Sequence, residues 1–205
     1  MDIPDLLNGV NGAELLEPNE KDREYIRKYK EIQLGIDPDE PAFVITPRQL
    51  FTIEKMLPEF TDKVAKELGK TGKDGEWEVG PMVSILAKAL LEESTKYATW
   101  ISKEITKGSS EKDKLCVCEL CAGAGVTTSK IFIEAKKNKF KNINIHAVDK
   151  SIESISIAYL LFRTQDISCK LITDCRDLDT MITDFDGVAL MYSDAQTYLE
   201  GLSSN

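Results

Sequence analysis

The second half of the sequence alternates between short apolar runs and helical patterns, and this alternation limits the possible folds more than any other feature. Residues 115–120, 143–148, 168–173 and 186–193 are apolar runs typical of strands. Residues 127–138 and 151–165 carry apolar positions at helical spacing between the first three runs. Strands alternating with helices predict an α/β fold with a mostly parallel, doubly wound sheet of about four strands.

The first half of the sequence reads as helical. Helical spacing extends over residues 20–34, over a segment that starts at Pro47, and over residues 80–108. Thr46 is the expected N-cap before Pro47, and Pro58 is expected to break or kink the helix that follows. We expect Tyr97 and Trp100 to pack in the core. The sequence therefore predicts a helical N-terminal region over 1–108, suited to a lid or a substrate-selecting part, and a cofactor-binding domain over 109–205.

The bulk composition excludes several classes of protein. The chain has 205 residues, of which 42% are hydrophobic and 30% charged, and its formal net charge is -9. An acidic surface repels phosphate backbones, so nucleic-acid partners are disfavoured. No apolar run is long enough to span a membrane, and no secretory signal is present at residues 1–22. The five cysteines are odd in number and lie in apolar surroundings, which favours a reducing, cytoplasmic location over a disulfide framework.

Polar residues follow each predicted strand. Glu119 ends the first run and is followed by Gly123 and Gly125, and Asp149 ends the second run. The later runs are followed by Asp174 and by the segment 192–194 (Tyr192, Ser193, Asp194). Because ligands of open α/β sheets bind at the carboxyl ends of the strands, these residues are expected to share one crevice.

Each acid also has a purely structural interpretation. Glu119 could cap the turn that follows it, and Asp149 could belong to the N-cap region of the next helix. Acids at successive strand ends are not required by capping, however. Taken together they favour a site in which glycines approach a nucleotide and an acid accepts hydrogen bonds from ribose hydroxyls.

The motifs "ELCAGAG" (119–125), "VDKS" (148–151) and "ITDCRDL" (172–178) resemble the first motifs of class I S-adenosylmethionine-dependent methyltransferases. The resemblance implies a Rossmann-like sheet with strand order 3-2-1-4 and S-adenosylmethionine as the cofactor. It implies that the glycine turn lies against the methionine and ribose parts, that Asp149 holds the ribose, and that Asp174 contacts the adenine. The cofactor-binding residues implied in this way are Glu119, Cys121, Gly123, Gly125, Asp149, Lys150, Ile152, Asp174 and Cys175.

Two features depart from the family pattern. Cys121 stands where the family usually has the first glycine of its motif. Only four of the family's seven strands are found, so the chain reads as the cofactor-binding half of that fold. The fourth strand would then have an exposed edge, which a second copy, a partner subunit or the N-terminal helices could cover, unless the chain is a piece of a longer protein.

The substrate side is defined only loosely. Tyr192, Ser193 and Asp194 are candidates to contact the methyl acceptor, and no catalytic base is assigned, because a base is needed only if the nucleophile must lose a proton. The acceptor itself is unknown, with a small molecule or a protein favoured by the acidic surface.

Three functions remain open. The first is an S-adenosylmethionine-dependent methyltransferase. The second is a non-catalytic, methyltransferase-like binding or assembly subunit, and the third is an NAD-dependent oxidoreductase, which would hold its ribose with the same acids. No metal site is expected. Cys116 and Cys118 lie inside a predicted buried strand, and the single histidine, His146, is interpreted as a structural strand residue.

Overall fold

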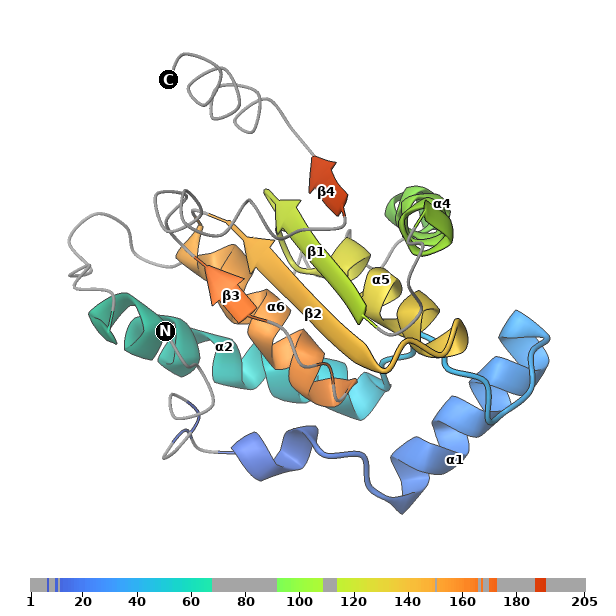
Figure 1. Cartoon of the computed structure of the whole chain (residues 1–205). Helices are drawn as coiled ribbons and strands as arrows, with labels where there is room; N and C mark the ends of the chain where they lie inside the picture. Colours follow the sequence, from blue (N-terminus) through green and yellow to red (C-terminus); the bar gives the residue numbers. More distant parts are fainter. Residues whose placement is uncertain are drawn as a thin grey trace, which may run out of the picture.

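The computed structural model describes residues 12–67, 92–108, 114–149, 151–165, 170–172 and 187–190, together with Leu7, Val10 and Ile167. Figure 1 shows the arrangement of its elements. They are η2 (Ala13–Leu16), α1 (Glu20–Tyr29), the π-helical turn η3 (Lys30–Leu34), α2 (Pro47–Glu67), α4 (Glu92–Gly108), β1 (Lys114–Leu120), α5 (Val126–Lys137), β2 (Asn142–Val148), α6 (Ile152–Thr164), β3 (Lys170–Ile172) and β4 (Gly187–Leu190). Within these described ranges, no helix has an apolar stretch that could cross a lipid bilayer.

The sheet is parallel. β1 and β2 pair over seven residues each, from Lys114 opposite Asn142 to Leu120 opposite Val148. The short strand β3 pairs with β2 and the short strand β4 with β1, also in parallel. All residues of β1 after Lys114 are buried, so both faces of this strand are covered. The prediction of a mixed α/β class with a parallel sheet is therefore confirmed.

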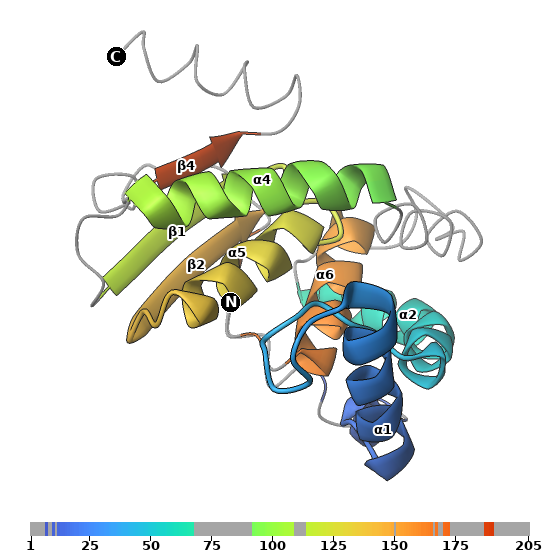
Figure 2. The ribbon, with the colours of Figure 1, turned by 90° about the vertical axis from the view of Figure 1, so that its right-hand side faces the viewer.

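The helices α5 and α6 lie on the same face of the sheet (Figure 2). Each connects two neighbouring parallel strands, and crossovers of one handedness in one direction along a sheet put their helices on one side. On this face α4 packs beside α5, and α2 packs beside α6. This arrangement brings the carboxyl ends of β1 and β2 next to the start of α5 and the start of α6.

The helix α2 belongs to the same hydrophobic core as the sheet. Its apolar side, including Ile53, Leu57 and Phe60, is fully buried and joins one cluster with β1, β2 and α6. Phe60 stacks on Tyr159 of α6 with ring centroids 5.2 Å apart. The division of the chain at residue 108 stays a prediction, but η2 and α2 share core contacts with the sheet.

The expectation of a helix break at Pro58 is wrong, and the alternative of a kink there stays a prediction. The helix continues through Pro58 from Pro47 to Glu67. Proline removes one backbone hydrogen bond from a helix interior. Around it, however, Leu57, Phe60 and Val64 bury their side chains in the core, and this tertiary packing outweighs the local cost.

The expectation that Trp100 packs in the core is also wrong, since its side chain is 58% exposed. The buried face of α4 is formed by Ala98, Ser102 and Thr106. Residues four apart share one face of a helix, whereas a residue two positions from Ala98 lies on nearly the opposite side. The side chain of Tyr97 lies outside the described part of the structure.

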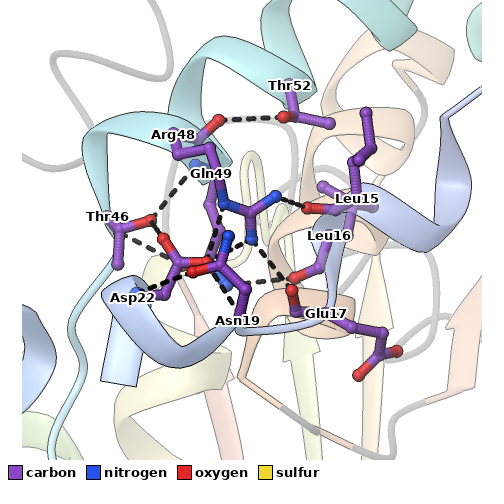
Figure 3. Close-up of polar contacts among 9 residues, drawn as sticks. All are labelled: Leu15, Leu16, Glu17, Asn19, Asp22, Thr46, Arg48, Gln49 and Thr52. Atoms are coloured by element: carbon purple, nitrogen blue, oxygen red, sulfur yellow. Dashed lines mark hydrogen bonds and ion pairs between the residues drawn. The ribbon is translucent and has the colours of Figure 1, made fainter. Parts of the chain in front are cut away.

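A polar cluster joins residues 15–22, here called the N-terminal arm, to the start of α2 (Figure 3). Its centre is Asp22 of α1, which is 3% exposed. The Asp22 carboxylate accepts hydrogen bonds from Thr46 Oγ1 at 2.7 Å and from Arg48 Nε at 2.7 Å. Burial alone would raise the pKa of Asp22, but the hydrogen bonds from Arg48, Thr46 and Asn19 and the charge of Arg48 hold it below its ordinary value.

The predicted N-cap at Thr46 is confirmed. Thr46 Oγ1 accepts from the backbone N–H of Gln49 at 3.2 Å, and Gln49 Oε1 accepts from the backbone N–H of Thr46 at 3.1 Å. This reciprocal pair is a capping box, which satisfies two backbone donors at the start of a helix. Gln49 Nε2 also donates to the carbonyl of Leu16 at 3.0 Å, so the cap itself holds the N-terminal arm in place.

Candidate functional site

The turn between β1 and α5 has an unusual backbone. Cys121, Gly123 and Gly125 all have positive φ, at 56°, 55° and 75°. Ala122 N–H donates to the carbonyl of Val148 at 2.9 Å, which ties the end of β1 to the end of β2. The turn therefore bends sharply at the carboxyl edge of the sheet, where ligands of open α/β sheets bind.

The two glycines serve different purposes. A Cβ at Gly125 would lie 2.6 Å from Cε1 and Cζ of Phe162 and 3.0 Å from Cβ of Ala158, so glycine allows this turn to approach α6 closely. A Cβ at Gly123 would meet nothing within 4 Å. Gly123 thus borders open space, and its lack of a side chain leaves the backbone accessible to a bound molecule.

Asp149 is held against this turn. Its Oδ2 accepts from the backbone N–H of Gly123 at 2.8 Å, and its Oδ1 accepts from the backbone N–H of Ser151 at 2.8 Å. The side chain is half-buried. A carboxylate has about four lone-pair sites, so each oxygen keeps the capacity to accept one more hydrogen bond, which is what a pair of ribose hydroxyls would require.

The N-cap of α6 is Ser151 rather than Asp149. Ser151 Oγ accepts from the backbone N–H of Ser154 at 3.1 Å. Asp149 therefore shapes the turn before the helix through Ser151 and leaves the capping of α6 to that serine.

Glu119 lies beneath the turn and is only 1% exposed. Its Oε2 accepts from Thr128 Oγ1, in the first turn of α5. Burial raises the pKa of Glu119 to about 7; hydrogen bonds from Thr128 and Thr127 oppose this shift, and the charge of Asp149 adds to it. These contacts agree with the structural interpretation of Glu119, and its role in cofactor binding stays a prediction.

The other predicted site residues are Ile152, which the structure describes, and six residues that lie outside the described ranges. Ile152 is 3% exposed and packs in the core cluster, so a contact with an adenine ring stays a prediction. The remaining members lie outside the described residues; they are Lys150, Asp174, Cys175, Tyr192, Ser193 and Asp194.

The buried cysteines follow the core-packing prediction. Cys116 and Cys118 lie 3% and 2% exposed in β1, whereas Cys121 is partly exposed in the turn. His146 is also buried, in β2. In the described ranges, no three His, Cys, Asp or Glu side chains gather as a metal site would need.

Sequence reasoning did not identify four residues that build this site. Thr127 and Thr128 hold Glu119, and Ala158 and Phe162 form the wall that Gly125 approaches. The two threonines could have been suspected from their place in the first turn after a glycine. The wall could not, because Phe162 lies 37 positions beyond Gly125 (162 − 125) and only the tertiary fold brings them together.

In chemical terms, this edge of the sheet offers a binding surface for a polar, uncharged group. It combines an accessible backbone at Gly123, a carboxylate with spare acceptor capacity at Asp149, and the N-terminus of α5. Such a set can orient a sugar or similar polyol through hydrogen bonds.

Comparisons with known proteins found one distant structural likeness. No family model matches the chain, and no curated protein matches it. One solved structure with similarity is a Listeria monocytogenes protein provisionally assigned to the class I S-adenosylmethionine-dependent methyltransferases. The match has a TM-score of 0.39 and 10% sequence identity and covers 73% of this chain, which spans 50% of that protein. A likeness this distant does not by itself establish a common fold.

Proposed function

We propose that the chain is an S-adenosylmethionine-dependent methyltransferase, with a Rossmann-like domain over residues 109–205 that binds the cofactor. The proposed sheet has the strand order β3-β2-β1-β4, with the helical region 1–108 beside it. The observation that carries this proposal is the 2.8 Å hydrogen bond from Gly123 N–H to Asp149 Oδ2. It holds the acid at the end of β2 directly against the glycine turn at the end of β1.

The described residues fit a nucleoside cofactor. Open space beside Gly123 would be filled by a Cβ in any other residue. Asp149 would accept hydrogen bonds from the two ribose hydroxyls through its remaining lone pairs. When bound, S-adenosylmethionine supplies a methyl group already activated on a sulfonium.

The protein's own contribution would be positioning. Two backbone donors fix the Asp149 carboxylate, so little side-chain freedom would be lost when a ribose binds. Glu119 and Thr128 would keep the turn in shape from below. Such preorganisation lets binding energy orient the reacting group, which is the main requirement of a methyl transfer.

The rest of the proposal concerns parts of the site that lie outside the described residues. Asp174 and Cys175 would contact the adenine, and Tyr192, Ser193 and Asp194 would face the methyl acceptor. We propose a small molecule or a protein as acceptor, since the net charge of -9 disfavours nucleic acid. We also propose a cytoplasmic location and a second copy or partner subunit on the outer edge of β4.

A second candidate is a binding subunit without catalytic activity. Cys121, where the family usually has glycine, has a φ of 56°, a region that costs an ordinary L-residue about 1–2 kcal/mol. A chain that tolerates this strain could bind the cofactor weakly or not at all. Cofactor affinity therefore separates the two candidates.

Titration calorimetry with S-adenosylhomocysteine tests the proposal. We expect a Kd in the micromolar range for the native chain and a loss of about tenfold or more in Asp149→Asn, because hydrogen bonds to a charged acceptor are the stronger ones. Asp37→Asn is the matched control, since Asp37 Oδ1 also accepts from a backbone N–H two residues on, at 2.8 Å from Asp39 N. Binding of NADH instead would select an oxidoreductase, and binding of neither compound would reject the cofactor site.

A further inference from the structure

A hollow of about 450 Å³ lies away from the glycine turn. It is lined by α1, η3, the segment 36–45, α4 and α5. The helix α5 reaches it from Lys130 onward, four positions past the start of the helix, or about 6 Å along its axis. Among the described residues, no member of the turn 121–125 lines the hollow. Its volume falls within the range of small-molecule sites.

Apolar and aromatic side chains form most of the wall. Tyr25 and Tyr29 of α1 stack with ring centroids 6.0 Å apart, and Phe43 lines the hollow from the segment after η3. Tyr25, Tyr29 and Leu34 are 39%, 37% and 43% exposed. Three of the seven large apolar side chains that are exposed in the described ranges therefore gather at this one hollow. Single exposed apolar side chains are ordinary on a protein surface, whereas a gathered group of them indicates a binding site.

The charged side chains of the wall balance one another. They lie on α5 and are Lys130, Glu134 and Lys137. Lys137 is paired with Glu40 at 2.7 Å. Burial, and then the charge of Lys137, lower the pKa of Lys130, whereas the charge of Glu134 raises it. Two cations are thus offset by two carboxylates, and among the described residues of this wall no charge of either sign is left over for a ligand.

This balance disfavours an ionic ligand. An ion that entered the hollow would lose part of its hydration, and it would meet only charges that already have an opposite charge nearby. An uncharged ligand avoids this cost. It still gains from burying apolar surface against the exposed rings, and flat rings pack well on other flat rings.

We propose that this hollow binds an uncharged aromatic molecule of two or three rings, held against Tyr25, Tyr29 and Phe43. The volume of the hollow sets the size of the ligand, the gathered rings favour an aromatic one, and the balanced charges favour a neutral one. The site does not depend on the nucleoside site, since the two are lined by different residues.

Fluorescence titration with N-phenyl-1-naphthylamine, an uncharged probe of three rings that brightens in apolar surroundings, tests this proposal. As the native chain is titrated into the probe, we expect a saturable rise in fluorescence with a Kd between about 1 and 100 µM. Competitors with one shared ring system then test the preference for a neutral ligand. The alcohol 1-naphthalenemethanol should displace the probe at a concentration about tenfold below that needed for 1-naphthoate or 1-naphthylmethylammonium, because both ions must give up hydration.

Tyr29→Ala removes one ring from the wall, so the Kd of the probe should rise about fivefold or more. Tyr25→Ala provides a second variant on the same wall, with the same expected result. Phe51→Ala is the matched control, because Phe51 is also an exposed ring on a helix, at 53%, but lines a different hollow on α2. This variant should bind the probe like the native chain. Circular dichroism should show all three variants to be folded, since each ring is more than one third exposed.

Four results would overturn the proposal. They are no saturation up to about 0.5 mM protein, an unchanged Kd in both tyrosine variants, displacement of the probe by either ion as readily as by the alcohol, and a loss of binding in Phe51→Ala. The last result would place the probe in the other hollow.

Discussion

Replacing Gly125 by alanine tests the close approach of the glycine turn to α6. The new Cβ would lie 2.6 Å from two ring carbons of Phe162 and 3.0 Å from Cβ of Ala158. Favourable carbon contacts are about 3.5–4.0 Å long. The structure must therefore shift the Phe162 ring by about 1 Å or open the gap between the turn and α6 by a similar distance.

The cost has two parts. A positive φ of 75° is strained for alanine, at about 1–2 kcal/mol. Overpacking a core position costs about 1–3 kcal/mol more. We expect Gly125→Ala to lower the free energy of unfolding by about 2–5 kcal/mol, measured by urea denaturation followed by circular dichroism.

Two other glycines isolate the clash. Gly35 and Gly123 have positive φ of 62° and 55°, and a Cβ at either would meet nothing within 4 Å. The free energy of unfolding of their alanine variants should fall only by the cost of the positive φ, about 1–2 kcal/mol. In addition, Phe162→Leu should cost less in the Gly125→Ala background than in the native chain, because the shortened side chain relieves the overlap. Equal losses at Gly125 and Gly35, with no coupling to Phe162, would refute this reasoning.

The remaining predictions also concern stability, each checked by chemical denaturation. Glu119→Gln should remove a pH dependence of the free energy of unfolding. The pKa of Glu119 is about 7 in the folded chain and 4.5 in the unfolded chain, so the free energy of unfolding of the native chain should fall by on the order of 3 kcal/mol as pH rises from 4.5 to 7. The variant should not show this fall. A native stability that does not fall over this interval would contradict the burial of Glu119. Cys121→Gly should stabilise the chain by about 0.5–1 kcal/mol by relieving its positive φ; a loss would show that the cysteine side chain contributes more than the strain costs. Asp22→Ala should cost about 2–4 kcal/mol, since it leaves Arg48 and Thr46 without their acceptor, and a change below about 0.5 kcal/mol would reject the polar cluster as a structural joint.

Local pattern predicted the central β1–α5–β2–α6 unit well. Apolar runs and helical stripes locate these elements to within about one or two residues, since each is buried along one side or on both faces. The N-cap at Thr46 was also predictable from local sequence, because its partner Gln49 is only three residues away.

Features that depend on distant contacts were not predictable. Pro58 is tolerated because α2 packs on α6, and Trp100 is exposed because α5 lies on the other side of α4. The bond between Asp22 and Arg48 joins residues 26 positions apart. Only the spacing of Asn19 and Asp22, a second capping box, hinted that Asp22 would be fixed.

The site was predictable in its residue types and less so in its roles. Glycines and acids at strand ends indicated a crevice, and the bond between Gly123 and Asp149 brings two of them together. The burial of Glu119 beneath the turn was only an alternative, because a strand-end position does not determine which way a side chain points.

The central claim, a nucleoside-cofactor site at Gly123, is tested most directly by titrating S-adenosylhomocysteine into the native chain, Gly123→Ala and Gly35→Ala. The two variants carry the same kind of backbone strain, and only Gly123 borders the proposed ligand. We predict micromolar binding to the native chain and to Gly35→Ala, with a loss of about tenfold or more in Gly123→Ala. Equal affinities in all three proteins, or no binding to the native chain, would contradict the account.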